Sequence, residues 1–466
     1  MNSFMSTLIP KEAIILAALT IWALAPNSWA CTPGPPNYAC STSSTSVIQT
    51  PTIAPFSGAI GVNTIKYDTS LNPSGTDAII RATDANTIGS GVSVTVTPSG
   101  GDNDNIFNTN STMFTVTNGG CQYVLGFNPS TMQVTNPVPT AVLCGQFTWS
   151  RTNPNVAYRL DSTGKIKKDT FTSPTSFTET LFYDFSTCSA LPSPLNVTWT
   201  GALSVTSDDK VFVAALSNAG AQGTGVFAAA LKVGSGCSVW NTKTGGVSGD
   251  WGATGTVSTS CRFKIHDSQA LKNGTAMTGG IWQVVSLGTA ISGCSNGGGN
   301  GIALFWNIGT TTVNYCTTNC PGHETFGYLK FINISNPNFV IRPVSNQAST
   351  TTFFTLPTPA PAENHFSWNN VDPNDTNATV ESSASVNGTW TSPYQNEVFA
   401  IFQTGTARRF GHNFITGNSP YFNCQQAIAS ISQDGNWMAV TSDMLNQLGS
   451  DSQGKNRCDV FLFHLQ

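Results

Sequence analysis

The 466-residue sequence predicts an all-β fold built from one antiparallel unit that recurs along the chain. Composition is the first reason. Only 9% of the residues are charged, against roughly 25% in typical globular chains, and Gly, Ser, Thr and Asn replace them. The second reason is a hairpin centred on Asp434-Gly435, because an Asp-Gly pair accepts the positive φ values of a tight hairpin turn. The third reason is that this hairpin has counterparts upstream.

Residues 1–30 read as a signal peptide. Lys11 precedes the apolar run 13–25, and Ser28 and Ala30 occupy the −3 and −1 positions of a cleavage site. The run is shorter than the ~20 residues that cross a bilayer, so export outweighs a membrane anchor and leaves no transmembrane segment after cleavage. A lipid on Cys31 is the weaker alternative, because Ser28 and Trp29 depart from the usual lipobox. We expect a periplasmic or extracellular protein.

Residues 31–58 are rich in Pro, Ser and Thr, which indicates a linker or an extended strap, and residues 59–466 form the expected β domain. The chain has 12 cysteines, an even number that favours disulfides once export is accepted. Three pairs fit the local topology: Cys31 with Cys40, Cys121 with Cys144, and Cys424 with Cys458.

Strand-like segments follow one another in order from residue 77 to the C-terminus. The segments with the clearest strand pattern are 77–83, 92–96, 105–116, 211–216, 225–233, 302–306, 398–402, 407–410, 427–432, 437–441 and 459–465.

The repeat predicts the architecture. Residues 146–155 align without gaps on 365–374, with Phe, Trp, Pro and Asn matching in place. Hairpin turns recur roughly every 54 residues, which is typical of a seven-bladed β-propeller. The seven turn positions are Asn110, Pro154, Asp208, Asn273, Pro337, Pro373 and Asp434. The last blade is one strand short, so we expect 77–83 to join it and remove the free edges of the ring.

Residues 432–443, Ser-Gln-Asp-Gly-Asn-Trp-Met-Ala-Val-Thr-Ser-Asp, resemble the blade signature of TolB-type propellers, a relative of the WD-repeat pattern. Blades near 203 and 268 match in part. The resemblance implies seven four-stranded blades around a channel over residues 60–466. It implies no particular chemistry, because this fold carries many functions.

Four of the five histidines fall near blade starts: His266, His323, His365 and His412. His266 and His365 share one register, which Gln146 occupies in an earlier blade. If the first strand of each blade lines the channel, these side chains converge and can hold a divalent metal. Such a ring resembles the His/Gln metal site of oligogalacturonate lyases, which are also seven-bladed propellers. The alternatives are histidines that brace turns, as in WD-type blades, or a simple polar lining.

Acidic, basic and aromatic residues supply the other candidates. Asp267 and Glu324 adjoin histidines and can act as a base or an orienting group. Arg408 can clamp a carboxylate, and Arg409 then faces the other side of its strand. We therefore expect Gln146, Asp267, Glu324 and Arg408 to line a binding surface. Six tryptophans suit either sugar stacking or core packing: Trp149, Trp199, Trp282, Trp306, Trp368 and Trp390.

The leading interpretation is an exported, monomeric, disulfide-stabilised propeller that binds a glycan or protein ligand at one mouth of its channel. A metal-assisted polysaccharide lyase or hydrolase is the alternative, and an envelope-assembly scaffold is a third. The net charge of −4 and the scarcity of basic residues exclude a nucleic-acid footprint. Nucleophile-elbow, phosphate-loop, EF-hand and HExxH motifs are absent, so the sequence leaves open whether the chain is an enzyme.

Overall fold

The structure is a computed structural model. It describes residues 38, 56, 61–71, 77–89, 91–96, 105–193, 195, 203–217, 225–270, 280–294, 303–316, 330–333, 338–341, 351–359, 363–367, 379–384, 391–402, 405–416 and 428–465. Within these ranges no helix has the length and apolar character needed to cross a membrane.

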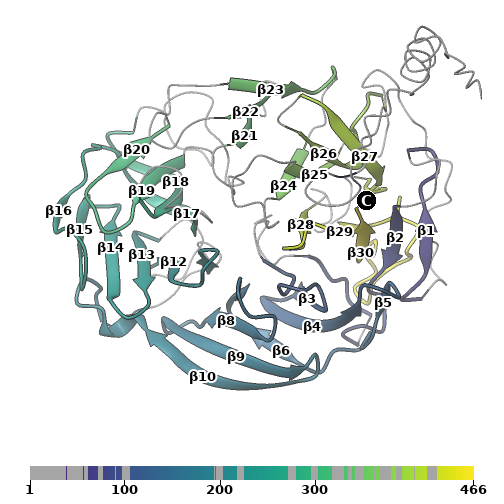
Figure 1. Ribbon diagram of the computed structural model, residues 1–466, viewed down its shortest axis with the longest axis horizontal. Helices are drawn as coiled ribbons and strands as arrows, with labels where there is room; N and C mark the ends of the chain where they lie inside the picture. The colour runs from purple at the N-terminus through teal and green to yellow at the C-terminus, as the bar shows by residue number, and fades with distance from the viewer. Residues whose placement is uncertain are drawn as a thin grey trace, which may run out of the picture.

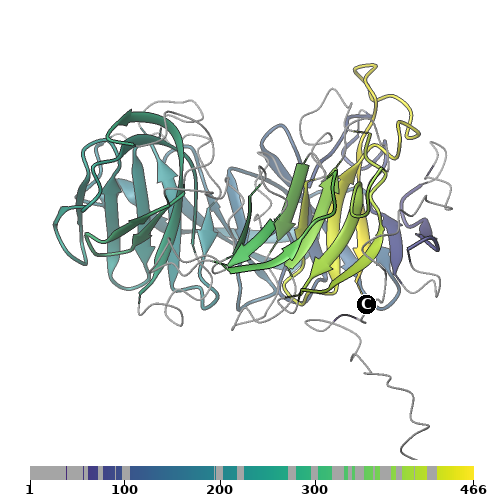
Figure 2. The same ribbon diagram turned by 90° about the horizontal axis from the view of Figure 1, so that it is seen from above.

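The described residues form seven antiparallel sheets arranged in a ring, as the sequence predicts (Figure 1). Colour runs round the ring from blue to yellow, so consecutive sheets are neighbours. The first strands β17, β24 and β28 lie toward the centre, and the last strands lie at the rim. Figure 2 shows the ring from the side, with the strands running across its thickness. The molecule is a seven-bladed β-propeller.

Blades 1 to 3 contain the strands from β3 to β16. Blade 1 comprises β3 (Met113–Asn118), β4 (Cys121–Asn128), β5 (Gln133–Val134) and β6 (Val142–Cys144). Blade 2 comprises β7 (Gln146–Trp149), β8 (Val156–Leu160), β9 (Lys165–Ser173) and β10 (Ser176–Asp184). Blade 3 comprises β11 (Ser204–Val205), β12 (Val211–Leu216), β13 (Phe227–Lys232), β14 (Gly236–Asn241), β15 (Gly246–Gly249) and β16 (Gly255–Thr256).

Blades 4 to 7 complete the ring. Blade 4 comprises β17 (Arg262–Ala270), β18 (Trp282–Ser292), β19 (Ala303–Asn307) and β20 (Val313–Tyr315). Blade 5 comprises β21 (Lys330–Asn333), β22 (Asn338–Ile341) and β23 (Thr351–Thr355). Blade 6 comprises β24 (Glu363–Ser367), β25 (Thr379–Ala384), β26 (Glu397–Ile401) and β27 (Ala407–His412). Blade 7 comprises β28 (Ala429–Ile431), β29 (Trp437–Ser442), β30 (Asp459–His464), β2 (Ala78–Arg81) and β1 (Ile65–Tyr67).

One hydrogen-bonded turn recurs at the inner hairpin of three blades. In blade 7 the Ser432 hydroxyl accepts from the Trp437 N–H, and the Asp434 carboxylate accepts from the Asn436 N–H. Thr206 with Asp208 in blade 3 does the same, and so does Asn108 with Asn110 in blade 1. In each turn the residue that follows the Asp or Asn has a positive φ. The value is 75° at Gly435, 56° at Asp209 and 57° at Ser111. Short polar side chains that hold their own backbone explain why the turns repeat in sequence.

The apolar core lies between neighbouring blades. Every residue of β12 is buried, and its side chains alternate between two clusters. Val211 and Val213 pack with residues of blade 4, whereas Phe212 and Leu216 pack with residues of blade 2. Successive side chains of a strand point to opposite faces, so a strand between two sheets must be apolar on both. Burying a large apolar side chain contributes about 1.5–3 kcal/mol.

The N-terminal strand closes the ring. β2 pairs with β30, with Ile80 opposite Leu462, as the sequence predicts for residues 77–83. The Arg81 guanidinium lies 2.6 Å from the Asp459 carboxylate, and both side chains are buried. β1 then adds outside β2. Blade 7 is therefore built from both ends of the chain, and β30 is paired on both sides, by β29 and β2.

The segment before β1 also packs on the core. Tyr38 and Phe56 are fully buried and belong to the cluster between blades 6 and 7. The Tyr38 hydroxyl donates to the Gly435 carbonyl at 2.8 Å, and its ring meets Phe410 edge-on. The other residues of 31–58 lie outside the described ranges, so the choice between a linker and an extended strap stays a prediction. The signal peptide proposed for residues 1–30 lies outside the described residues.

Candidate functional site

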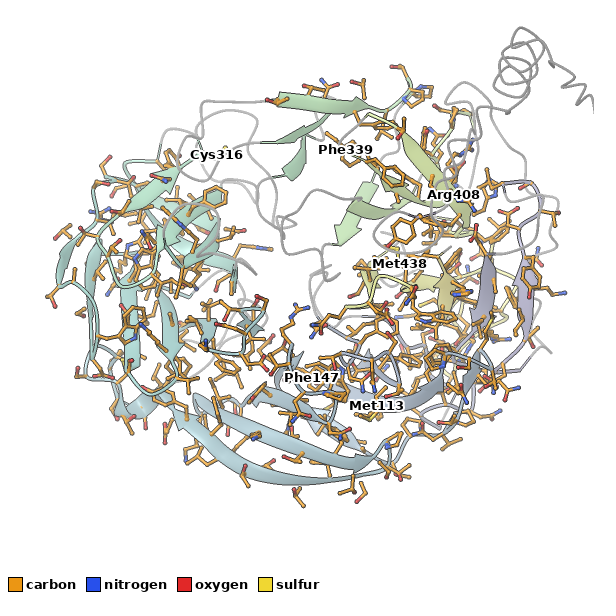
Figure 3. All side chains as sticks on the ribbon, in the orientation of Figure 1. Met113, Phe147, Cys316, Phe339, Arg408 and Met438 are labelled. Carbon is orange, nitrogen blue, oxygen red and sulfur yellow. A yellow bond between two sulfur atoms is a disulfide. The ribbon has the colours of Figure 1, made fainter. Side chains whose placement is uncertain are left out.

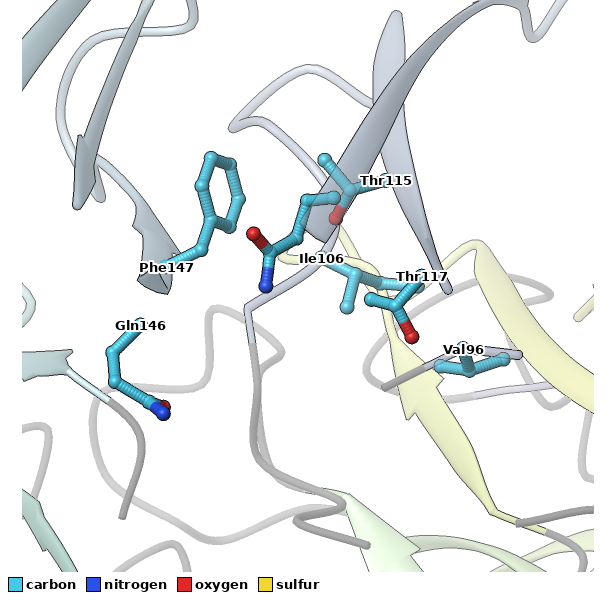
Figure 4. Close-up of a pocket in the computed structure, with 7 residues that line it drawn as sticks. Val96, Ile106, Thr115, Thr117, Gln146 and Phe147 are labelled. Carbon is cyan, nitrogen blue, oxygen red and sulfur yellow. The ribbon is translucent and has the colours of Figure 1, made fainter. Parts of the chain in front are cut away.

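A pocket lies at the inner edge of blades 1 and 2, where the two sheets face each other (Figure 4). Gln146 and Phe147, at the start of β7, lie on one side, and residues of blade 1 lie on the other. The blade 1 side consists of Val96, Ile106, Thr115, Thr117 and Gln122. The enclosed volume is about 10 Å³, which is room for about one water molecule and far below the 300–1,000 Å³ of sites that enclose a drug-sized ligand.

The pairing of blade 1 explains why polar groups face this space. Thr117 lies directly opposite Gln122 on β4, and Thr115 precedes Thr117 by two residues, so all three project from one face of the sheet. Further along that face Met113 and Val124 join the apolar core. Figure 3 shows Met113 beside Phe147, where blades 1 and 2 meet.

The electrostatic character of the pocket is neutral, because its lining consists of amides, hydroxyls and apolar groups. The Thr117 hydroxyl lies 3.1 Å from the Thr95 hydroxyl. The Thr115 Oγ1 and the Gln122 Oε1 atoms are buried and have no hydrogen-bond partner among the described residues. Gln146 is a residue that its sequence register predicts for this region, whereas Thr115 and Gln122 are not among the predicted residues.

Two of the four histidines lie on first strands. His266 is on β17 and His365 is on β24, each the innermost strand of its blade. Burial lowers the pKa of His266, so its ring favours the neutral form that can bind a metal ion. The side chain of His365 lies outside the described part of the chain, as does that of Asp267. His323 and Glu324 also lie outside it.

His412 occupies a different place from the one expected. It lies on β27, the outermost strand of blade 6, and is fully buried. Its Nδ1 is 2.5 Å from the Asp68 carboxylate, and its Nε2 is 3.8 Å from Glu397. The expectation that it lines the channel with the other histidines is wrong, because Gly411-His412 ends a last strand. The bracing alternative describes it better, since it links the N-terminal segment to blade 6.

Arg408 likewise does not line the channel. It lies on β27, beside which Figure 3 labels it, and its guanidinium is 2.5 Å from the buried Asp77 carboxylate. Arg409 faces the other side and forms an ion pair with Glu397, both fully buried. The reason is that segments from the N-terminus cover this outer strand. A pattern of alternating faces cannot reveal such a cover.

Disulfides link segments of blades 1 to 4. Cys121–Cys144 is present, together with Cys188–Cys237 and Cys261–Cys294, which the sequence left unassigned. Cys458 is also disulfide-bonded, while Cys31, Cys40 and Cys424 lie outside the described residues. Asp250 approaches Cys188 and Cys237 closely. This group is a poor metal site, because thiolates bind metals and these sulfurs are bonded to each other.

The described tryptophans that were sugar-stacking candidates belong to the core. Trp149, Trp282 and Trp306 are each at most 3% exposed. Their ring faces are therefore not available to a ligand. The core-packing alternative describes these three tryptophans. Trp199, Trp368 and Trp390 lie outside the described ranges.

Turns of three blades meet at the end of the ring opposite Gln146. The Asp209 carboxylate in blade 3 accepts from the backbone N–H groups of Arg151 and Thr152 in blade 2. The Gln433 amide in blade 7 donates to the Arg151 carbonyl at 2.8 Å. Blades 7 and 2 lie on either side of blade 1, so the hydrogen bond between Gln433 and Arg151 links the two neighbours of blade 1.

No family model and no curated protein matches the chain. Among the solved structures that are similar to it are two oligogalacturonate lyases. An oligogalacturonate lyase from Vibrio parahaemolyticus has a TM-score of 0.48 and 8% identity, covering 87% of this chain and 97% of that one. An oligogalacturonate lyase in complex with manganese has a TM-score of 0.47 and 10% identity, covering 87% and 99%. At this level neither similarity bears on what the chain binds or does.

Proposed function

We propose that the protein is an exported, disulfide-stabilised propeller that binds a glycan or protein ligand at the mouth of its channel where β7 begins. The pocket at Gln146 carries the proposal. Its lining combines apolar walls with a few amides and hydroxyls, which is the usual make-up of a ligand site. No lining residue titrates near neutral pH, so the pocket offers neither an acid–base pair nor a nucleophile activated by one.

A metal-assisted polysaccharide lyase or hydrolase is the second candidate. The observation in its favour is that His266 and His365 both belong to innermost strands. With a bound divalent metal these two imidazoles would be the holding residues, and the metal would supply a Lewis acid. His412, engaged with Asp68, would not contribute.

Metal content separates the two candidates. The mature protein and a His266→Ala plus His365→Ala variant are compared by plasma mass spectrometry, and both are incubated with polygalacturonate while unsaturated products are followed by ultraviolet absorbance. The binding proposal expects no stoichiometric transition metal, no product, and saturable binding of a glycan or protein. A metal present at one equivalent, lost in the double variant together with product formation, would overturn it in favour of the lyase.

Export and a monomeric state belong to the same proposal. Disulfides support export, because they form and persist in oxidising compartments. Intact-mass measurement of the secreted protein should give an N-terminus at Cys31, and light scattering should give the mass of one chain. Residues 432–443 resemble TolB-type propellers, so an envelope-assembly scaffold is a third candidate function. Capture of envelope proteins that is unaffected by changes at Gln146 would favour that role instead.

A further inference from the structure

Three polar side chains interrupt an otherwise apolar face between blades 1 and 2. Thr115, Thr117 and Gln122 are 1%, 2% and 3% exposed, and they share their face with the core residues Met113 and Val124. Burying a hydroxyl or an amide without a hydrogen bond costs free energy. The large majority of buried polar side-chain atoms in native proteins have a partner, which is either another protein group or an ordered water.

The protein supplies a partner to one of the three side chains. The Thr117 hydroxyl lies 3.1 Å from the Thr95 hydroxyl. Thr115 Oγ1 and Gln122 Oε1 each expose less than 1 Å², and no described residue bonds to either atom. Thr117 lies directly opposite Gln122 on β4, and Thr115 precedes Thr117 by two residues on β3. The three polar groups are therefore neighbours on one face of two adjacent strands.

The space that these groups border has the size of one water molecule. Its enclosed volume is about 10 Å³, and a cavity needs roughly 10–15 Å³ to hold one water. Val96, Ile106 and Phe147 form apolar walls around it (Figure 4). The lining contains no charged side chain, and a bare calcium ion would need about six to eight oxygen ligands. A neutral water molecule therefore fits both the volume and the chemistry of this space.

We propose that one buried water molecule bridges Thr115 Oγ1, Gln122 Oε1 and Thr117 Oγ1 and is an integral part of the packing between blades 1 and 2. Gln122 Oε1 only accepts hydrogen bonds, so the water donates one hydrogen to it. A threonine hydroxyl donates and accepts, so Thr115 can donate to the water oxygen while Thr117 accepts the second hydrogen. Three hydrogen bonds are typical of a buried water.

The bridge separates the structural part of the pocket from its accessible part. Thr115, Thr117 and Gln122 are buried and bonded to the water, whereas Gln146 is half-buried. Gln146 is therefore the polar lining residue that a ligand can contact. The water site does not depend on the proposed function, because it follows from the packing of the two blades whatever the channel mouth binds.

The test uses the mature full-length protein with Thr115→Val and Gln122→Met, singly and together. Each substitution removes one polar atom that contacts the water and keeps the side-chain volume nearly constant. Thr178→Val on β10 and Gln133→Met on β5 make the same chemical changes at exposed positions and are the matched controls. Urea unfolding measures the stability of every variant, and a high-resolution crystal structure of the wild type locates ordered water.

The proposal expects each single pocket variant to have a folding equilibrium constant about fivefold lower than that of its control, the loss of about one hydrogen bond. The double variant should lose less than the product of the two single losses, because both substitutions weaken the hold on the same water. The wild-type density should show a water within hydrogen-bonding distance of Thr115 Oγ1 and Gln122 Oε1.

Three results would overturn the proposal. In a dry space each pocket variant would lose only a buried polar atom without a partner, so it would be as stable as its control or more stable. Fully independent effects of the two substitutions would show that Thr115 and Gln122 do not share a partner. A wild-type structure with no water between these two atoms would exclude the bridge even if both variants were destabilised.

Discussion

Changing Asp68 to Asn should loosen the junction between the N-terminal segment and blade 6. The Asp68 carboxylate is fully buried, accepts from the His412 backbone N–H at 2.8 Å and lies 2.5 Å from the His412 ring nitrogen. It also accepts from the Ser70 N–H at 3.1 Å. Removing one partner of a buried charged pair costs about 3–5 kcal/mol. Because Asn keeps one acceptor, we expect about 3 kcal/mol, or a melting temperature about 4 °C lower for a domain of this size.

The pH dependence gives this prediction its sharper form. Burial by itself raises the pKa of Asp68, but the hydrogen bond and charge of His412, aided by Ser70, outweigh it and hold that pKa below its usual value. A carboxyl whose folded-state pKa is lowered contributes stability above its unfolded pKa, and that stability is lost as pH falls through the folded pKa. The difference between wild type and Asp68→Asn should therefore be largest at neutral pH and shrink on acidification.

Thermal unfolding at a series of pH values tests both parts. Asp84→Asn is the control, because Asp84 accepts from the Asn86 N–H in an exposed turn, a bond that Asn can also accept. It should change stability by about 0.5 kcal/mol or less. A pH-independent gap for Asp68→Asn, or a gap no larger than that of the control, would refute the reasoning.

Three further predictions concern stability. Ser111→Gly should stabilise the protein by about 1 kcal/mol, since it relieves a left-handed residue and removes a buried, unbonded hydroxyl, while Gly435→Ser at the equivalent turn should destabilise it by a similar amount; urea unfolding measures both, and equal effects of the same sign would contradict the turn equivalence. Phe212→Ala should cost about 3–5 kcal/mol, because Phe212 is fully buried against Tyr158; a urea midpoint close to wild type would contradict this packing. Replacing Cys121 and Cys144 by Ser opens a loop of 23 residues and should cost about 3 kcal/mol; urea unfolding of the oxidised proteins measures this, and a midpoint equal to that of the oxidised wild type would contradict it.

Local patterns were sufficient for the repeat. Six of the seven turn positions fall, in chain order, between the first and second strands of a blade, and Asn110 lies just before β3, in the turn closed by the Phe107–Phe114 bridge. Turn chemistry is local, because side chains such as Ser432 and Asp434 bond to backbone within five residues. The closing strand was also predictable, since blade 7 lacked a strand and 77–83 was the unassigned segment with a strand pattern.

The candidate site was only half predictable. Gln146 could be chosen because its register matches two histidines in later blades. Thr115 and Gln122 carry one weak signal, which is that β3 has an apolar face at Phe114 and Val116 and a mixed face at Thr115 and Thr117. The pattern does not say that the mixed face is buried against blade 2, so these residues read as a solvent-exposed face.

By itself the sequence determined the all-β class, the number of turns and the disulfide between Cys121 and Cys144, because each depends on residues close together in the chain or on a spacing that repeats. Only the tertiary structure decided where Arg408 and His412 lie. Their partners Asp77 and Asp68 are more than 300 positions away along the chain. Those pairs exist because closing the ring brings the first strands against the last two blades.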